Sequence, residues 1–137
     1  MEESTTFRVI TLNWKHAEAE GFPSTSGIYQ AYGDSPIYGV SCLLYIGQSR
    51  NLQSRLHQHE KDSPLTSQNN KSYRYAECAI EMLDIAESIL IAAHKPSLNA
   101  EYLKSPSETA IRYMVQNHGE RGVLSLQVTN SYWVPCA

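Results

Sequence analysis

The alternation of hydrophobic and polar positions along the chain predicts several short β-strands. Aromatic and β-branched residues gather in runs that are bounded by glycine, proline and small polar residues, as strands between turns are. The predicted strands are Phe7–Leu12, Gly27–Tyr32, Val40–Ile46, Tyr73–Cys78, Val123–Val128 and Tyr132–Val134. The second and third strands are joined through a turn, so we expect them to pair as an antiparallel β-hairpin with an elaborated connection.

Apolar residues at helical spacing predict helices between these strands. The predicted helices are Trp14–Glu20, Asn51–Lys61, Ile80–Ala93 and Ser105–His118. The third is apolar nearly all round and should be central and buried, and Pro96 prevents it from continuing. The fourth begins with a serine cap, a proline in the first turn and a glutamate three residues after the cap, which is a typical helix start.

Length and composition favour a single domain that spans residues 1–137. The chain is 42% hydrophobic and 18% charged, which suits a globular protein with a real core. Its three cysteines lack Cys-x-x-Cys spacing, which argues against a disulfide framework and a structural zinc site, so a reducing cytoplasmic setting is the simpler expectation. The sequence has no apolar run of the roughly 20 residues that a membrane helix needs, and its acidic N-terminus lacks a signal-peptide pattern.

The charge balance limits the kind of anion-binding site that the chain can carry. Lys and Arg number 11 against 14 Asp and Glu, for a net charge of −3. Proteins that bind nucleic acid usually carry a basic surface, and the numbers of charged residues do not indicate one here. Any site for phosphate must therefore be local.

Glu87 is the polar residue that stands out, because it lies in the middle of the most apolar predicted helix. A buried carboxylate is costly unless it is paired or binds a cation. The alternative is a carboxylate on a thin polar stripe that also holds Glu81, Asp84 and Ser88.

A cation and an imidazole occupy one face of the predicted helix that follows the hairpin. Arg55 and His59 are four residues apart, which places them on the same side of a helix. An arginine there could clamp a phosphate, and a histidine could act as an acid, a base or a phosphate contact. Taken singly, Arg55 and His59 are more commonly ordinary surface residues. Tyr29 and Tyr45, taken singly, are more commonly strand tyrosines that pack against their neighbours.

Taken together and in order, these residues resemble the GIY-YIG nuclease superfamily. Both name-giving tripeptides are present without substitution, and the resemblance covers about residues 26–99. The matching residues, in chain order, are Gly27-Ile28-Tyr29, Tyr45-Ile46-Gly47, Arg55, His59, Glu87 and Asn99.

The resemblance implies a fold and an activity. The expected fold is α/β (α+β), a small central and largely antiparallel three-stranded sheet flanked by helices, with extra elements in residues 1–25 and 100–137. The expected activity is hydrolysis of DNA phosphodiester bonds with one divalent metal ion, Mg²⁺, for which Mn²⁺ can substitute.

The resemblance also implies residue roles. Glu87 would be the metal ligand, and a lone carboxylate with waters and substrate oxygens suits Mg²⁺. Arg55 would neutralise charge that builds up on the phosphate, and Tyr29 or Tyr45 would hold or deprotonate the attacking water. His59 would assist by hydrogen bonding. The expected substrate contacts are Gly47, Arg50 and Asn99, of which Asn99 could instead brace the site.

Two other interpretations stay open at the level of the sequence. The acidic balance also suits a catalytically silent module of the same fold that binds nucleic acid or protein, and a nuclease that acts on RNA is a weaker option. A DNA groove would be assembled from few cations, so a homodimer or a partner subunit could supply further contacts. The candidate cations are Arg50, Arg55, Lys61, Lys71, Arg74 and Lys95.

Overall fold

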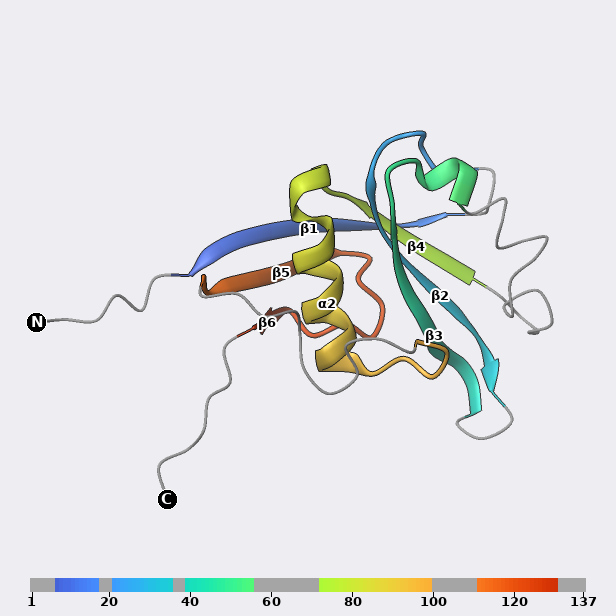
Figure 1. Ribbon diagram of the computed structural model, residues 1–137. Coiled ribbons are helices and arrows are strands. Elements are labelled where there is room, and N and C mark those ends of the chain that lie inside the picture. The colour runs from blue at the N-terminus through green and yellow to red at the C-terminus, as the bar shows by residue number, and fades with distance from the viewer. Residues whose placement is uncertain (1–6, 18–20, 36–38, 56–71, 100–110, 131–137) are drawn as a thin grey trace, which may run out of the picture.

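The chain builds one mixed sheet with a helix across one of its faces. A computed structural model describes residues 7–17, 21–35, 39–55, 72–99 and 111–130. Its six strands lie in the order β3-β2-β4-β1-β5-β6 (Figure 1). The strands are β1 (Arg8–Ala17), β2 (Gly27–Ser35), β3 (Gly39–Ser49), β4 (Ser72–Glu77), β5 (Tyr113–Gly119) and β6 (Gln127–Thr129).

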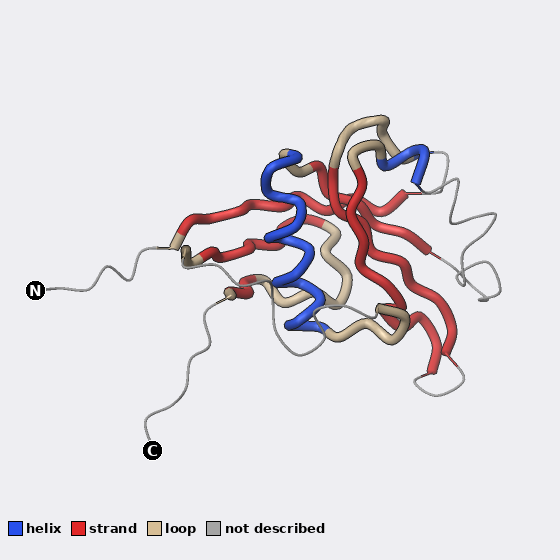
Figure 2. Tube along the Cα trace, in the orientation of Figure 1, coloured by secondary structure: helices blue, strands red, loops and turns tan. Residues whose placement is uncertain are grey.

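All neighbouring strands are antiparallel except one pair. β2 pairs with β3 and with β4, β1 pairs with β4, and β5 pairs with β6, all in antiparallel fashion. β1 and β5 run parallel, with Arg8 opposite Tyr113 and Trp14 opposite Gly119. Figure 2 shows that strands make up most of the described chain and that the long helix crosses them.

The helix that crosses the sheet is α2 (Leu83–His94), which follows the 3₁₀ turn η3 (Ile80–Met82). It ends at His94 and is capped by Lys95, which has a left-handed backbone (φ 48°) and donates its N–H to the carbonyl of Ile91 at 2.8 Å. Pro96 follows directly, and the helix ends before it, as the sequence predicts. No helix among the described residues is long and apolar enough to cross a membrane.

Apolar side chains form two clusters, one on each face of the sheet. The larger packs beneath α2 and includes Leu12, Trp14, Ile28 and Ile46. The smaller lies on the opposite face and contains Tyr29 with other apolar and aromatic residues. Because successive strand residues point to opposite faces, neighbours such as Ile28 and Tyr29 belong to different clusters.

The helix expected at Trp14–Glu20 is wrong for the described part, because β1 continues to Ala17. Burial alternates along β1: Leu12 and Trp14 are buried, whereas Asn13 and Lys15 between and after them are exposed. That two-residue period is typical of a strand. β5 pairs with β1 from Arg8 to Trp14, and β4 pairs with it from Lys15 to Ala17. The Trp14 indole N–H donates to Asn117 Oδ1 at 2.9 Å.

The helix expected at Ser105–His118 is also wrong where the structure describes it, because residues 113–119 form β5. Tyr113, Val115 and Asn117 are buried, and the residues between them are not, so the pattern is again that of a strand. The helix-start signal itself lies at 105–108, outside the described residues. The strand expected at Val123–Val128 begins only at Gln127, and Tyr132–Val134 lies outside the described residues.

The mixed α+β class is confirmed, but the three-stranded sheet is a sheet of six strands. The extra strands come from the segments that flank residues 26–99, because β1 pairs along β4 and then carries β5 and β6. The β2–β3 hairpin and the helix expected at Ile80–Ala93 are confirmed. The helix expected at Asn51–Lys61 is described only from 52 to 55.

Buried polar groups attach the loop after β5 to the sheet and to α2. Gln30 is fully buried, and its amide donates to the carbonyl of Arg121 at 3.1 Å. Tyr32 Oη donates to Gln30 Oε1 and accepts from the N–H of Val123 at 3.1 Å. His94 Nε2, at the end of α2, accepts from the N–H of Ser125 at 2.9 Å. The loop is thus held at several points along its length.

Candidate functional site

Two tyrosines and a glycine meet where the edge strand β3 pairs with β2. Tyr29 lies directly opposite Gly47, and Ala31 lies opposite Tyr45, so the two rings share one face of the sheet. Their centroids are 6.0 Å apart and their planes are tilted by 35°. Tyr29 is only 1% exposed, whereas Tyr45 is half-buried. Solvent and substrate therefore reach Tyr45 more easily than Tyr29.

Gly47 is required by this packing. A Cβ at residue 47 would lie 2.4 Å from both Cζ and Oη of Tyr29 and 2.7 Å from Cε1 of Tyr45. The phenol of Tyr29 thus packs directly against the backbone of Gly47, which carries no side chain. The sequence suggested close approach of a ligand here, and the structure fills the space with a tyrosine of the site itself.

Arg55 reaches the tyrosines from a helical turn that is fixed at its start. Asn51 Oδ1 accepts from the N–H of Ser54 at 3.1 Å, which satisfies an otherwise unpaired donor of the first turn. The N–H of Leu52 donates to the carbonyl of Thr25 at 3.0 Å, which ties the turn to the start of β2. The half-buried Arg55 side chain hydrogen-bonds both Tyr29 and Tyr45. The hydrogen bond with Tyr29 is the main cause that raises the pKa of Arg55.

The electrostatics of Tyr29 keep its proton on the phenol. Burial raises the pKa of Tyr29 far above its ordinary value of 10.0, and the neighbouring Tyr45 raises it further. The hydrogen bond and the positive charge of Arg55 oppose this rise without cancelling it, and the negative charge of Glu87 adds to it. The last effect also places the Glu87 carboxylate within electrostatic reach of Tyr29.

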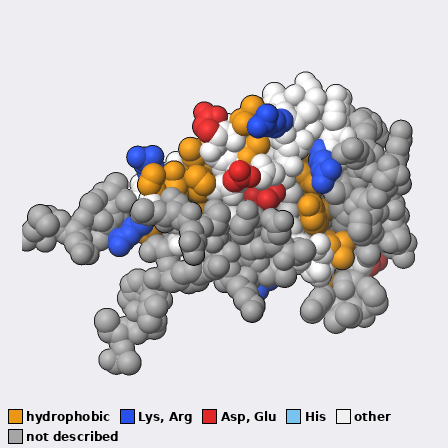
Figure 3. Space-filling view, viewed as in Figure 1, with side chains coloured by type: hydrophobic (Ala, Val, Ile, Leu, Met, Phe, Trp, Pro, Cys, Tyr) orange, Lys and Arg blue, Asp and Glu red, His pale blue; other side chains and the backbone are white. Residues whose placement is uncertain are grey.

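Glu87 lies on α2 beside a second carboxylate, and one amide holds both. Gln48 Nε2 donates to Asp84 Oδ1 at 2.5 Å and to Glu87 Oε1 at 3.4 Å. Asp84 is exposed and Glu87 half-buried, so Glu87 is less deeply buried than its apolar neighbours in the sequence suggested. Figure 3 shows acidic side chains over α2 with Lys or Arg side chains beside them. Both carboxylates therefore reach solvent.

The donor atoms on this face of α2 suit a hard divalent cation. Carboxylate oxygens from Asp84 and Glu87, with water to complete the shell, are what Mg²⁺ prefers, because it keeps several waters and takes one or two carboxylates. The described residues contain no group of three or more His, Cys, Asp and Glu that could hold a metal ion, which excludes a closed cage within that part of the chain.

Asn99 braces the outer edge of β3 just beside the site. Its Oδ1 accepts from the N–H of Ile46 and its Nδ2 donates to the carbonyl of Ile46, both at 2.9 Å. The N–H of Leu98 donates to the carbonyl of Leu44 at 2.8 Å. The Asn99 side chain thereby hydrogen-bonds Ile46 as a residue of a neighbouring strand would. It fixes the backbone between Tyr45 and Gly47.

The other residues expected at the site have different outcomes. His59, Lys61 and Lys71 lie outside the described residues. Arg74 belongs to the opposite face of the sheet from Tyr29: its guanidinium lies 5.4 Å from the centroid of the Tyr32 ring and donates to the carbonyl of Glu120 at 3.1 Å. Arg50 is exposed directly after β3, so it remains a candidate substrate contact.

The sequence interpretation missed Gln48 as a site residue and took Asp84 only as part of a polar stripe. The spacing of Asp84 and Glu87, three residues apart on a helix, was a usable signal because such residues are neighbours on its surface. The bridge from Gln48 needed the three-dimensional pairing of β3 with α2, and no sequence signal could have found it.

No known family model matches the chain, and no curated protein matches it. Among solved structures, the chain is similar to the GIY-YIG N-terminal endonuclease domain of UvrC from Thermotoga maritima bound to its catalytic magnesium ion, at 17% identity and a TM-score of 0.48. That match covers 60% of this chain and 91% of the other. A point mutant of the same domain, bound to its catalytic divalent cation, is 16% identical over 61% of this chain and 91% of the other, with a TM-score of 0.49. The function must therefore be inferred from the residues of this chain.

Proposed function

We propose that the protein is a metal-dependent endonuclease that hydrolyses DNA phosphodiester bonds. The observation that carries the proposal is one constellation. Arg55 hydrogen-bonds the tyrosines of both tripeptides, and the Glu87 carboxylate is close enough to act on Tyr29. A cation that stabilises charge on a phosphate and a carboxylate that can hold a metal ion are groups that catalyse phosphodiester hydrolysis, and the phenols lie between them in reach of an attacking water.

In this proposal Arg55 binds the scissile phosphate. A guanidinium carries its charge at every relevant pH and offers several N–H donors to phosphate oxygens. It stabilises the negative charge that builds up when water attacks. Its hydrogen bonds with Tyr29 and Tyr45 fix its position before substrate arrives.

The burial of the two tyrosines supports different roles for them. The buried Tyr29, with its raised pKa, keeps its proton and acts as a hydrogen-bond donor or a brace for Arg55. The half-buried Tyr45, on the same face and also hydrogen-bonded to Arg55, holds and deprotonates the attacking water. The sequence left the choice between them open, and the burial difference favours Tyr45.

Glu87, with Asp84 beside it, would hold one Mg²⁺, which when bound polarises the phosphate and stabilises the leaving oxygen. Gln48 keeps the two carboxylates side by side. Asn99 holds the strand that carries Tyr45, Gly47 leaves room for the Tyr29 phenol, and Arg50 offers charge to the DNA backbone. His59 would add a hydrogen bond to the phosphate or a tyrosine.

Cleavage of plasmid and of branched DNA in Mg²⁺ or Mn²⁺ tests the proposal. Arg55→Ala and Glu87→Gln should each lose activity by on the order of 10²-fold or more. The matched controls are Arg112→Ala and Glu81→Gln, exposed residues outside the constellation that should cut like the wild type. If the wild type cuts no better than Arg55→Ala and Glu87→Gln, the enzyme proposal is refuted.

The net charge of −3 favours a second candidate, a module of the same fold that binds nucleic acid or protein and has no catalytic activity. A band shift with DNA and no cleavage under any metal would support that module. Competition between DNA and RNA substrates would identify a nuclease that acts on RNA. Measurement of mass in solution, with and without DNA, would show whether a homodimer forms on the substrate.

A further inference from the structure

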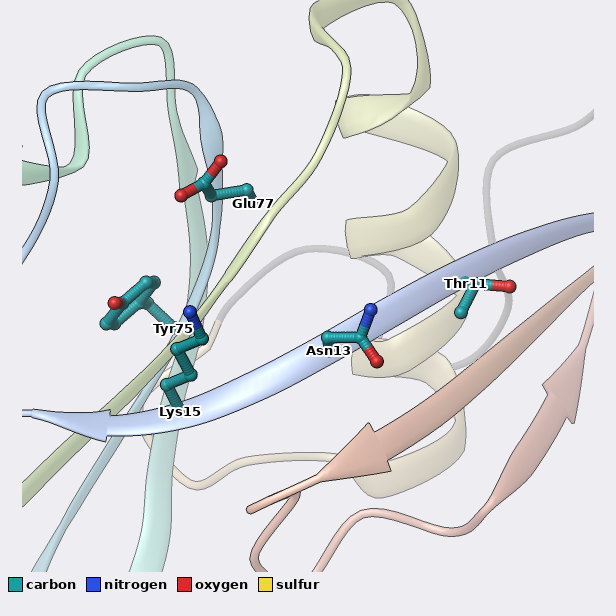
Figure 4. A pocket seen from close by; sticks show the side chains of 5 residues that line it. All are labelled: Thr11, Asn13, Lys15, Tyr75 and Glu77. Atoms are coloured by element: carbon teal, nitrogen blue, oxygen red, sulfur yellow. The ribbon is translucent and has the colours of Figure 1, made fainter.

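A polar hollow of about 230 Å³ lies on β1 and β4. Among the described residues, its lining consists of Thr11, Asn13, Lys15, Tyr75 and Glu77 (Figure 4). The three β1 residues alternate with the core residues that pack beneath α2, so the hollow opens on the face of the sheet opposite α2. All lining residues are exposed except Tyr75, which is half-buried.

The hollow shares its face of the sheet with the two tyrosines of the candidate active site, whereas Glu87 lies on α2. Tyr29 lies opposite Gly47 on one side and opposite Tyr75 on the other, and Tyr75 lies opposite Lys15. These four residues therefore form one row across β3, β2, β4 and β1. Neighbouring strands are about 4.8 Å apart, so the row from Gly47 to Lys15 spans roughly 14 Å. A strand of B-form DNA rises about 3.4 Å per nucleotide, so that span equals about four nucleotides.

The chemistry of the lining fits a nucleotide better than a simple anion. Lys15 supplies a cation for a phosphate, and the Tyr75 ring, which Phe22 supports at a centroid distance of 5.0 Å, offers an aromatic surface for a base. Asn13 and Glu77 supply an amide and a carboxylate, the groups that read adenine and the amino group of cytosine. A site for phosphate alone would exclude the carboxylate of Glu77.

We propose that this hollow binds one nucleotide of the substrate strand, about four nucleotides from the scissile phosphate, and reads its base through Asn13 and Glu77. The proposal rests on the proposed nuclease function for its distance from the cut. It gives β1, which lies outside the residues that resemble a nuclease, a role in selecting DNA sequence.

Two measurements on the full chain test the subsite. The first is fluorescence anisotropy with labelled oligonucleotides, without divalent metal, over a range of salt concentrations. Lys15→Ala should weaken binding to every sequence and lower the salt slope by about one. Arg8→Ala removes a cation of the same strand from the opposite face and is the matched control, because it should bind like the wild type.

The second measurement is cleavage of an oligonucleotide pool with all four bases at each position near the cut. The wild type should prefer one base about four nucleotides from the cut, and Asn13→Ala and Glu77→Gln should reduce or change that preference by roughly 5- to 150-fold. An unchanged preference in both variants, or Lys15→Ala binding like Arg8→Ala, would overturn the proposal.

The two proposals fail in different ways. If the wild type binds DNA through Lys15 but cuts nothing, the nuclease function is refuted and the subsite stands as a DNA-binding site. If the wild type cuts DNA and the hollow variants bind and cut as it does, the subsite is refuted and the nuclease stands. If the wild type neither binds nor cuts any oligonucleotide, both are refuted.

Discussion

Replacement of Gly47 by alanine tests whether the site depends on bare backbone beneath Tyr29. Ordinary van der Waals contact begins near 3.4 Å, and the new Cβ would lie 2.4 Å from the Tyr29 phenol, so the ring must retreat by 3.4 − 2.4 = 1.0 Å. Tyr29 is 1% exposed and hydrogen-bonded to Arg55, so it has little free space into which to move. Arg55 should be displaced with it.

Two effects of opposite sign decide the free energy of unfolding of Gly47→Ala. Loss of a glycine restricts the unfolded chain and stabilises by about 0.4–1 kcal/mol where the backbone allows it, and Gly47 is not among the glycines with positive φ. Overpacking in a tight site costs about 1–3 kcal/mol. Because contacts at 2.4 Å to a buried ring are severe, we expect overpacking to win with a net loss of about 1–2 kcal/mol.

Urea denaturation of a double-mutant cycle measures this coupling, with Tyr29→Leu as the second change. Leucine is shorter than tyrosine and removes the clash with Tyr29, so Gly47→Ala should cost clearly less in that background, where only the contact with the half-buried Tyr45 remains. In the nuclease assay, a displacement of about 1 Å at the site should lower kcat by on the order of 10²-fold. An equal loss of stability in both backgrounds, or full activity of Gly47→Ala, would refute the reasoning.

Three further predictions concern neighbouring groups. Asn99→Ala should lower the free energy of unfolding by about 1–3 kcal/mol in urea, because two hydrogen bonds to Ile46 are lost; Asn99→Asp should be at least as costly, since a carboxylate oxygen would face the Ile46 carbonyl. Gln48→Met should raise the Mg²⁺ concentration for half-maximal cleavage by about 10-fold, because the amide that holds Glu87 is gone; an unchanged metal dependence would contradict this role. Burial lowers the pKa of His94 below 6.5, so the unfolded chain binds the proton more tightly, and stability should be lost as pH falls below about 6.5; His94→Gln should remove that part of the pH dependence in urea titrations.

The sequence was sufficient where local signals and tertiary structure agree. The β2–β3 hairpin and α2 follow from strand-forming runs and a long apolar helix pattern, and both are confirmed. The tripeptides placed Tyr29 and Tyr45 on paired strands, and the structure brings both to Arg55.

The sequence failed where a partner strand lies far away along the chain. Trp14 sits in a segment whose local pattern also suits a helix, and its strand conformation is fixed by pairing with β4 and β5. The same holds for residues 113–119, where a helix-start signal nearby favoured the wrong period. The hydrogen bonds from Gln48 to Asp84 and Glu87 and the hollow beside Lys15 depend on strand register, which cannot be read from a single sequence.

The place of β1 inside the sheet sets the order in which a newly made chain can finish folding. β1 is synthesised early, but its parallel partner begins at Tyr113, which is 113 − 8 = 105 residues after Arg8. At about 5–20 residues per second, a ribosome needs roughly 5–20 s to make that stretch. Until then one edge of β1 lacks its partner, and an unpaired edge invites pairing with other chains. The growing polypeptide is therefore most exposed to misassembly just before β5 emerges.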